Sequence, residues 1–420
     1  MQSIFEFAGY ATIAGALLHA SFASLRALGR WRREVSTGHA EQELFRKHAK
    51  ETLYIAQVNR VREQTTWNGY RKFYIDRKVP EPGGVCSFYL KPHDHRPIPP
   101  FEPGQFLTFR LKIPGQVKPV IRCYSLSDSP LERDYYRVSI KKVPPPMDRP
   151  DLPPGLSSNF FHDHLNVGDV VDVAAPNGHF FMDTKSERPV VLIGGGVGLT
   201  PVLSMLNTIA LSESKRETWF FYGVRNKTEH AMADHLRSLT EQHDNINLAV
   251  CYSQPTEECV EGHDYQVEGF VSVDLFKSLL PSSNYEFYVC GPPPMMSSIT
   301  GGLEAWGVPE EDINFEAFGP ATVKKTPVAE HSDAVSGTTV TFDMSGKSVT
   351  WNGDGTSILE LAEQNGIDID SGCRAGNCGT CVTAIKSGKV KYISEPGSPQ
   401  EEGTCLVCIA VPDGDVTFNI

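Results

Sequence analysis

Closely spaced cysteines near the end of the chain limit its fold more than any other feature of the sequence. Cys373, Cys378 and Cys381 lie in the run SGCRAGNCGTC, and Cys405 and Cys408 follow in TCLVCIAVP. The chain has 420 residues and only ten cysteines, so half of its thiols fall in this short region. Such clustering indicates a metal or cofactor site in a reducing compartment rather than a disulfide scaffold. The glycines of the run would let backbone N–H groups approach sulfur closely.

The spacing Cys-x4-Cys-x2-Cys resembles that of plant-type [2Fe–2S] ferredoxins. The resemblance implies that the cluster ligands are Cys373, Cys378, Cys381 and Cys408. The last ligand is chosen because the family carries it in L-x-C-x-A-x-P, which matches residues 406–412, and Cys405 is then expected to be a buried thiol. A zinc site is the alternative, but zinc sites favour two short-spaced pairs of ligands over one tight triad.

The pattern of apolar runs in the rest of the chain predicts several domains, and 420 residues are enough for them. Short β-branched and aromatic runs between Pro and Gly clusters predict an antiparallel β-barrel, whereas apolar strands that alternate with helices predict a parallel sheet. The predicted parts are an N-terminal helix over 1–35, a helical stalk over 36–66, a flavin-binding barrel over 67–186, an NAD(P)-binding α/β domain over 187–320, a linker over 321–336 and a β-grasp ferredoxin domain over 337–420.

An iron–sulfur centre takes single electrons whereas nicotinamide delivers two, so a flavin site is expected upstream. The run RCYSLSD at 122–128 resembles the R-x-Y-S motif of the ferredoxin–NADP reductase superfamily, and GLSSNFF at 155–161 resembles its second phosphate-binding turn. The resemblance implies FAD, with FMN as the alternative, bound by Arg122, Tyr124, Ser125, Gly155, Ser157 and Ser158. In that family the arginine neutralises the pyrophosphate, the tyrosine packs on the ring and the serine reaches the flavin N5 region.

A nicotinamide site is predicted by LIGGGVGLTPVLSML at 192–206, where a strand runs into glycines and a helix follows. Glycines there let a pyrophosphate approach the helix N-terminus. Two later runs, YVCGPPPMM at 288–296 and NFEAFG at 314–319, resemble the family's C-G-P-x-x-M and E-x-F-G motifs. The residues expected to bind NADH or NADPH are Gly195, Gly196, Gly198, Thr200, Pro201, Arg225, Asn226, Cys290, Gly291 and Pro292. The residues expected to serve catalysis are Ser125, Cys290, Glu316 and Phe318.

The order of flavin, nicotinamide and ferredoxin parts resembles that of phthalate dioxygenase reductase. The stretch YGVRNKTEHAMADHLRSL also resembles the reductase half of flavohemoglobins, although no globin sequence precedes it here. The first 66 residues fall outside these resemblances. Within them, residues 7–25 carry no formal charge and four arginines follow, which predicts an anchor in the inner membrane with the rest of the chain on its cytoplasmic face. An amphipathic helix on the membrane or on the protein is the alternative.

These features predict an electron-transfer reductase that passes electrons from NAD(P)H through flavin to a [2Fe–2S] cluster and on to a partner oxygenase, hydroxylase or desaturase. A membrane-associated NAD(P)H:quinone reductase would share every cofactor and differ only in its acceptor, and a redox sensor would need neither a flavin nor a nicotinamide motif. Nucleic acid is not expected as a partner, because the net charge is −12. The segment 337–420 has 11 acidic and 5 basic residues, a net charge of −6, which favours a basic docking surface on the partner protein.

Overall fold

The computed structural model describes residues 60–145, 149–318, 337–376, 378–393, 396 and 400–420, together with positions 19, 26, 46, 49, 52, 53 and 56. Contacts between residues divide the chain into the units Met1–Gln64 and Thr65–Ile420. In the first unit, residues 60–64 are helical. No helix among the described residues is both long and apolar enough to cross a membrane. The predicted anchor at 7–25 lies outside the described residues except at His19, and the predicted linker at 321–336 lies outside them entirely.

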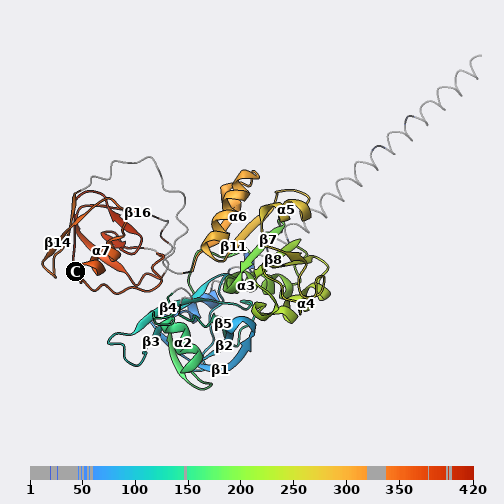
Figure 1. Ribbon diagram of the computed structural model, residues 1–420, viewed down its shortest axis with the longest axis horizontal. Helices are drawn as coiled ribbons and strands as arrows, with labels where there is room; N and C mark the ends of the chain where they lie inside the picture. Colours follow the sequence, from blue (N-terminus) through green and yellow to red (C-terminus); the bar gives the residue numbers. More distant parts are fainter. Residues whose placement is uncertain are drawn as a thin grey trace, which may run out of the picture. The chain divides into compact units, whose positions relative to one another are not determined.

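The second unit begins with the predicted antiparallel barrel, which is confirmed (Figure 1). Its strands are β1 (Arg71–Glu81), β2 (Val85–Pro92), β3 (Phe106–Leu111), β4 (Val120–Ser125), β5 (Tyr136–Lys141) and β6 (Val170–Val173). They form one sheet in the order β4-β3-β6-β1-β2-β5, and an isolated bridge between Leu126 and Val138 joins its two edges. Alternate residues of these strands fill one apolar core.

Helix α2 (Leu156–Asp163) packs on this core through Phe161, whose ring makes edge contacts with Phe88 and Phe109 at 5.2 Å each. Gly155 precedes the helix as its N-cap residue. The aromatic contacts therefore hold the start of α2, with its unpaired backbone N–H groups, in a fixed place beside the barrel.

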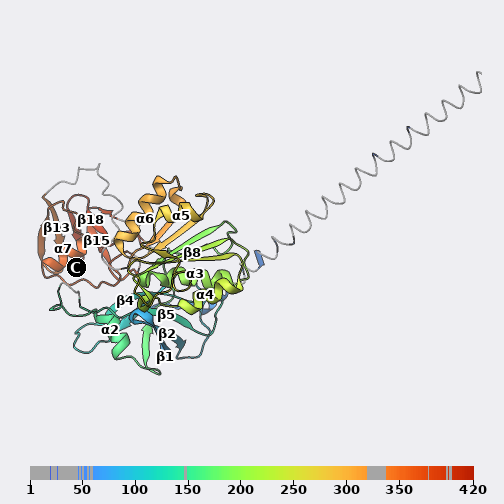
Figure 2. The ribbon, with the colours of Figure 1, turned by 45° about the vertical axis from the view of Figure 1, so that its right-hand side comes forward.

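The next domain is the predicted α/β unit, with parallel strands in the order β10-β9-β8-β7-β11-β12. The strands are β7 (Val190–Gly195), β8 (Thr218–Val224), β9 (Ile246–Tyr252), β10 (Val267–Glu268), β11 (Glu286–Cys290) and β12 (Ile313–Glu316). The helices are α3 (Leu199–Leu211), α4 (Ala233–Gln242), α5 (Val273–Leu279) and α6 (Pro293–Ala305). Strand β7 buries side chains on both faces, as parallel strands do. One apolar cluster joins the sheet to α3 and α4 and another joins it to α5 and α6, so the helix pairs cover opposite faces (Figure 2).

The last domain has a mixed sheet in the order β14-β13-β19-β15-β17 and a separate β16-β18 pair. Its elements are β13 (Thr338–Phe342), β14 (Lys347–Trp351), α7 (Ile358–Gln364), β15 (Val382–Ser387), β16 (Val390–Tyr392), β17 (Thr404–Leu406), β18 (Ala410–Pro412) and β19 (Val416–Phe418). A capping box between Ser357 and Glu360 starts α7. The N–H of Leu359 donates to Val407 O at 2.9 Å, which fixes the helix beside the segment that carries the last cysteine.

Candidate cofactor-binding site

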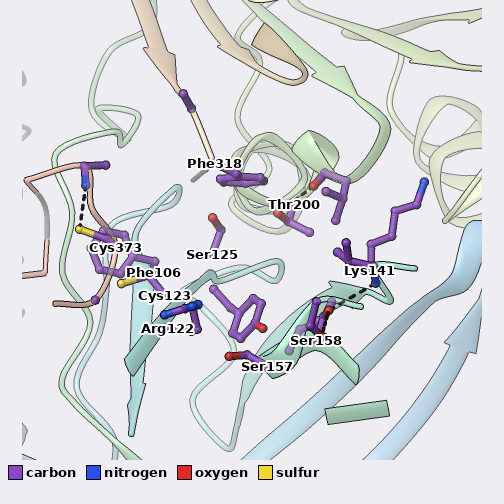
Figure 3. A pocket seen from close by; sticks show the side chains of 18 of the residues that line it. Phe106, Arg122, Cys123, Ser125, Lys141, Ser157, Ser158, Thr200, Phe318 and Cys373 are labelled. Atoms are coloured by element: carbon purple, nitrogen blue, oxygen red, sulfur yellow. Dashed lines mark hydrogen bonds between the residues drawn. The ribbon is translucent and has the colours of Figure 1, made fainter. Parts of the chain in front are cut away.

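A cavity of about 600 Å³ is lined by residues of the barrel, the α/β domain and the cysteine loop (Figure 3). The barrel contributes Phe106, Arg122, Cys123, Tyr124, Ser125, Ser139, Ile140, Lys141, Val143, Gly155, Leu156, Ser157 and Ser158. The α/β domain contributes Val197, Thr200, Glu316, Ala317 and Phe318, and the cysteine loop contributes Gly372, Cys373, Arg374 and Ala375. All six residues predicted to bind flavin therefore line one cavity.

The R-x-Y-S residues lie at the end of β4, where the strand reaches the cavity. The ring of Tyr124 packs edge-on against Phe109 and Phe161, with centroid distances of 5.8 and 5.3 Å. Burial raises the pKa of the Tyr124 phenol, so the ring stays neutral. Ser125 is buried, whereas Arg122 is partly exposed and donates from Nη1 to Ile121 O at 2.7 Å. The strand thus presents a cation, an aromatic ring and a hydroxyl to the cavity in sequence.

The turn before α2 fits an anionic group. Ser158 Oγ accepts from Val143 N at 3.3 Å and donates to Gly155 O at 3.2 Å, which fixes the turn. Ser157 Oγ is buried and makes no well-formed hydrogen bond among the described residues, although it lies close enough to the Tyr124 hydroxyl to lower the pKa of that group against the larger effect of burial. A buried hydroxyl left unpaired is costly, so a ligand that bonds to it would gain affinity. Together with the backbone N–H groups at the start of α2, this hydroxyl suits a flavin phosphate.

The turn between β7 and α3, which we call the glycine turn (Gly195–Gly198), packs directly on the end of β11. A Cβ atom at Gly198 would lie 2.7 Å from Gly291 N and still closer to the Cys290 carbonyl, so only glycine fits there. A Cβ at Gly195 would meet the ring of Pro292 at 2.8 Å. Gly196 has φ +53° in the left-handed region that favours glycine. The two motifs predicted to bind the nicotinamide coenzyme therefore form one continuous surface.

Helix α3 begins directly after this turn. Thr200 and Pro201 lie buried in its first turn, where proline is tolerated because its missing N–H has no helical partner. Thr200 Oγ1 donates to Val197 O at 3.1 Å, and both residues line the cavity (Figure 3).

Cys290 lies between Gly194 and Glu316, its partners on the neighbouring parallel strands. The Cys290 side chain is fully buried, and burial together with the nearby Glu316 carboxyl raises the pKa of its thiol. Burial also raises the pKa of Glu316 to about 8, and its Oε2 has no hydrogen-bond partner among the described residues. Both side chains are therefore neutral at pH 7. Phe318 is 41% exposed and also lines the cavity, two residues beyond Glu316.

Of the ten residues predicted to bind the coenzyme, Thr200 lines this cavity, and the other nine, Arg225 and Asn226 among them, are not part of its lining. Arg225 follows β8 and lies 3.6 Å from Glu229 through its guanidinium, while Asn226 accepts from Thr228 N at 3.1 Å and caps a short helix. Their place beyond the carboxyl ends of β8 and β9 is the edge at which parallel sheets bind nucleotides. Their predicted role in coenzyme binding stays a prediction.

The predicted cluster ligands fall into two pairs. Cys381 Sγ and Cys408 Sγ lie 3.1 Å apart. Cys373 and Cys378 each receive the other's backbone N–H, at 3.3 and 3.2 Å to sulfur. Cys405 is buried in the domain core, as expected for a structural thiol.

A binuclear cluster needs this arrangement, because each of its two irons takes two thiolates. In the described part of the chain, no three His, Cys, Asp or Glu side chains are grouped as a single metal ion would require. The paired sulfurs with donors aimed at them therefore fit [2Fe–2S] better than zinc.

The structure adds lining residues that the motifs did not predict. Lys141 contributes a cation from β5, and its Nζ lies 3.4 Å from Glu229. Cys123, the variable position within R-x-Y-S, lies between the flavin motif and Cys373 (Figure 3). Arg374 adds a second basic side chain. The sequence signal for Lys141 is its place at the end of the β-branched and aromatic run YYRVSIK, three residues before the prolines that begin at Pro144.

Comparison with protein families agrees with this division of the chain. Residues 81–182 match an oxidoreductase FAD-binding domain, residues 192–300 an oxidoreductase NAD-binding domain and residues 340–413 a 2Fe-2S iron-sulfur cluster binding domain.

Individual relatives cover either the first two domains or all three. A flavohemoprotein of Halalkalibacterium halodurans is 41% identical over 255 residues, which are 61% of this chain and 61% of that protein. The flavohem-like FAD/NAD-binding domain of a nitric oxide dioxygenase from Vibrio cholerae is 32% identical, with a TM-score of 0.54 over 60% of this chain and 100% of that domain. The fold of phthalate dioxygenase reductase covers 84% of this chain and 98% of that one, at 24% identity and a TM-score of 0.53.

The chain therefore belongs to the oxidoreductases that join an FAD-binding to an NAD-binding domain, the ferredoxin–NADP reductase superfamily. Its particular form has a 2Fe–2S domain at the C-terminal side, in the order of phthalate dioxygenase reductase. Its cofactors are FAD, a nicotinamide coenzyme and a 2Fe–2S cluster. The chain spans about three fifths of the length of the flavohemoproteins that it matches.

Proposed function

We propose that this protein is an electron-transfer reductase that oxidises NADH or NADPH and delivers electrons to a separate acceptor protein. The observation that carries the proposal is one cavity lined by the R-x-Y-S strand, the first turn of α3 and the cysteine loop. The bound flavin would take two electrons as hydride from the coenzyme and pass them singly to the iron–sulfur cluster. The side chains of the protein would bind the flavin, orient the nicotinamide and hold the cluster.

Holding the flavin requires a cation, hydroxyls and an apolar wall. Arg122 would pair with phosphate, helped by the N–H groups at the start of α2 and by the hydroxyls of Ser157 and Ser158. Tyr124 would pack on the ring, and its own packing against Phe109 and Phe161 limits its movement. Ser125 would offer its hydroxyl to a ring nitrogen. These residues bind and orient the flavin and do not react.

Orienting the nicotinamide is the role proposed for the opposite wall. Gly195, Gly196 and Gly198 leave room for a pyrophosphate at the start of α3. Cys290 and Glu316, both buried and neutral at pH 7, would border the nicotinamide ring without placing a charge beside the hydride. Phe318, partly exposed, would cover the flavin until the coenzyme displaces it. Water is thereby excluded from the reacting faces.

Holding the cluster is the role proposed for Cys373, Cys378, Cys381 and Cys408. Backbone N–H groups of Ala375 and Cys378 point at Cys373 Sγ at 3.4 and 3.3 Å. Such donors stabilise the added negative charge of the reduced state.

The acceptor is proposed to be a terminal oxygenase, hydroxylase or desaturase with a basic docking surface. Support comes from the net charge of −6 over residues 337–420. Opposite charges speed and orient encounters between electron-transfer partners. Anchoring through residues 7–25 would bring a membrane-bound acceptor within reach, and it stays a prediction from sequence.

Anaerobic titration of the purified protein with NADH, and separately with NADPH, tests the proposal. We expect bleaching of the flavin absorbance followed by the electron paramagnetic resonance signal of a reduced [2Fe–2S] cluster. The coenzyme that reduces the flavin faster is the physiological donor. A flavin that neither coenzyme reduces would contradict the proposal. Reoxidation by a quinone as fast as by any protein acceptor would favour the quinone reductase instead.

A further inference from the structure

A buried group of polar side chains joins the flavin domain to helix α3. We call it the interdomain polar cluster, and its members are Asp128, Arg137, Ser204, Asn207 and His235. Asp128 follows β4, Ser204 and Asn207 lie on α3, and His235 lies on α4. None of these residues lines the cavity described above. The proposed function so far gives them no role.

Asp128 is the centre of this cluster. Asp128 is 9% exposed, and both oxygens of its carboxylate have partners. Oδ1 accepts from Ser129 N at 3.0 Å and from Asn207 Nδ2 at 3.1 Å. Oδ2 accepts from Tyr135 OH at 3.0 Å and lies 3.3 Å from Arg137 Nη1. The carboxylate therefore binds β5 and α3 at once.

Helix α3 contributes two separate bonds to the same segment. Ser204 Oγ donates to the backbone oxygen of Asp128 at 2.6 Å. Asn207 Nδ2 faces the carboxylate, so Asn207 Oδ1 faces His235 Nε2 at 2.7 Å, which must carry the proton. The amide orientation is thus fixed from both sides, and α3 can neither slide nor turn relative to Asp128 without breaking a buried bond.

Asp128 and helix α3, which these bonds join, each lie close in sequence to a motif predicted to bind a cofactor. Asp128 follows Ser125, the proposed flavin contact, by only three residues. Thr200 lies on the same face of α3 as Ser204, one turn nearer the glycine turn. The contact between Asp128 and α3 therefore determines where the two walls of the cavity lie relative to each other.

We propose that Asp128 is a positioning residue. It holds the flavin wall (the end of β4 with Ser125) and the nicotinamide wall (the start of α3 with Thr200) at the separation that hydride transfer requires. The inference rests on the proposed function, because it assigns both walls their cofactors. Hydride transfer needs reacting atoms about 3–3.5 Å apart, and a misplacement of about 1 Å costs on the order of 100-fold in rate. Apolar packing alone is not directional, whereas the bonds of Asp128 fix both distance and rotation.

The test is stopped-flow reduction of the flavin, by whichever of NADH and NADPH reduces the unmodified protein faster, in Asp128→Ala and, from the α3 side, in Asn207→Leu. Asp312→Ala is the matched control. Asp312 is 8% exposed and accepts from both terminal nitrogens of Arg188 at 2.6 and 2.8 Å, so its loss also breaks an ion pair of a buried carboxylate, whose partner side chain is 46% exposed. It precedes β12, at the amino end of the sheet and away from the cavity. Flavin content, the dissociation constant for NAD⁺ and the melting temperature are measured for each variant.

We expect all three variants to melt at lower temperature and to keep their flavin. Asp128→Ala and Asn207→Leu should lower the limiting rate of flavin reduction by about 10- to 100-fold, change the NAD⁺ dissociation constant by less than about twofold, and weaken the long-wavelength charge-transfer absorbance of the complex of reduced flavin with NAD⁺. The double variant should lose little more than either single one, since both break one link.

Equal rate losses in Asp128→Ala and Asp312→Ala would overturn the inference, as would an unchanged rate in Asp128→Ala or Asn207→Leu. If Asp128→Ala does not fold, Asn207→Leu decides alone. The unmodified protein is measured first with both coenzymes. Failure of both NADH and NADPH to reduce it would contradict the proposed function, whereas normal reduction without an effect of the variants would contradict only the positioning role.

Discussion

Cys290 and Glu316 occupy neighbouring, paired positions on the parallel strands β11 and β12, and both side chains are buried. A thiol and a carboxyl group are thereby held next to each other at the carboxyl edge of a sheet, and neither forms an ion pair with any residue that the structure describes. Burial is the largest cause of the raised pKa of both. Of the two residues, Glu316 lines the cavity, and its neutral carboxyl group gives the cavity a polar border without charge at physiological pH.

The first prediction concerns the pH dependence of stability. The pKa of Glu316 is raised from 4.5 to about 8, so the folded protein holds a proton that the unfolded chain releases. The favourable contribution is complete below pH 4.5 and is lost as the pH rises toward 8, by up to about 1.4 kcal/mol per pH unit. We expect Glu316→Gln to gain in melting temperature relative to the unmodified protein across this range. Glu304→Gln, at an exposed position of α6, is the control, and an equal gain there would contradict the assignment.

The second prediction separates two nearby cysteines. Cys408 pairs with Cys381 at 3.1 Å, whereas Cys405 is fully buried in the core and pairs through its backbone with Thr383. We expect Cys408→Ser to lose most of the bound iron and the reduced-cluster resonance signal. Cys405→Ala should keep both and lose only stability, by about 1 kcal/mol for the small cavity left. The opposite result would move the fourth ligand to Cys405.

The third prediction concerns the contact between the glycine turn and β11. Gly198→Ala would place a methyl group against the backbone of Cys290 and Gly291, which cannot give way as a flexible side chain could. We expect a loss of about 1–3 kcal/mol in unfolding free energy and a weaker affinity for NAD⁺, measured by calorimetry. Gly301→Ala is the control, because nothing lies within 4 Å of its Cβ position on α6 and alanine favours helix by about 1 kcal/mol. Normal NAD⁺ affinity in Gly198→Ala would exclude the turn from coenzyme binding.

The fourth prediction uses the unpaired hydroxyl of Ser157. Because Ser157 Oγ makes no well-formed bond among the described residues and only a weak contact with the Tyr124 hydroxyl, Ser157→Ala should change the melting temperature of the flavin-free protein little. Its affinity for FAD should fall by about 10- to 100-fold, the value of one lost bond to a charged group. Ser158→Ala serves as the comparison, since Ser158 Oγ holds the turn through Val143 and Gly155 and its loss should destabilise the flavin-free protein too. Unchanged FAD affinity in Ser157→Ala would remove this residue from the site.

Local sequence patterns predicted much of the fold. The strand predicted before the glycines is β7, and the helix predicted after them is α3; nearly every residue of both is buried, as the continuous apolar runs predict. Strand β1 has no such local pattern, because charged residues are spread along it and a proline lies near its end. It is defined instead by its pairing with β2 and β6.

The site was less predictable than the fold. Sequence motifs predicted the site residues of R-x-Y-S and of the glycine turn. Lys141 and Arg374 line the cavity only because segments distant in the sequence pack together. The link from Asp128 to Asn207 spans 79 residues and has no local pattern at all. Contacts of this kind depend on the approach of two domains, which short motifs do not encode.

The order of strands in the barrel has a consequence for the loss of its cofactor. Strands β4 and β5 are the two outer strands of one sheet, and both line the cavity. An isolated bridge between Leu126 and Val138 and a hydrogen bond from Ser127 N to Arg137 O join these two edges. A ligand bound between them spans the seam where a further strand pairing would otherwise close the cylinder. A flavin held there, as we propose, would contribute to the barrel wall as well as to electron transfer. Release of the flavin should open this seam first, and amide exchange should quicken along β4 and β5 while β1 and β2 stay protected.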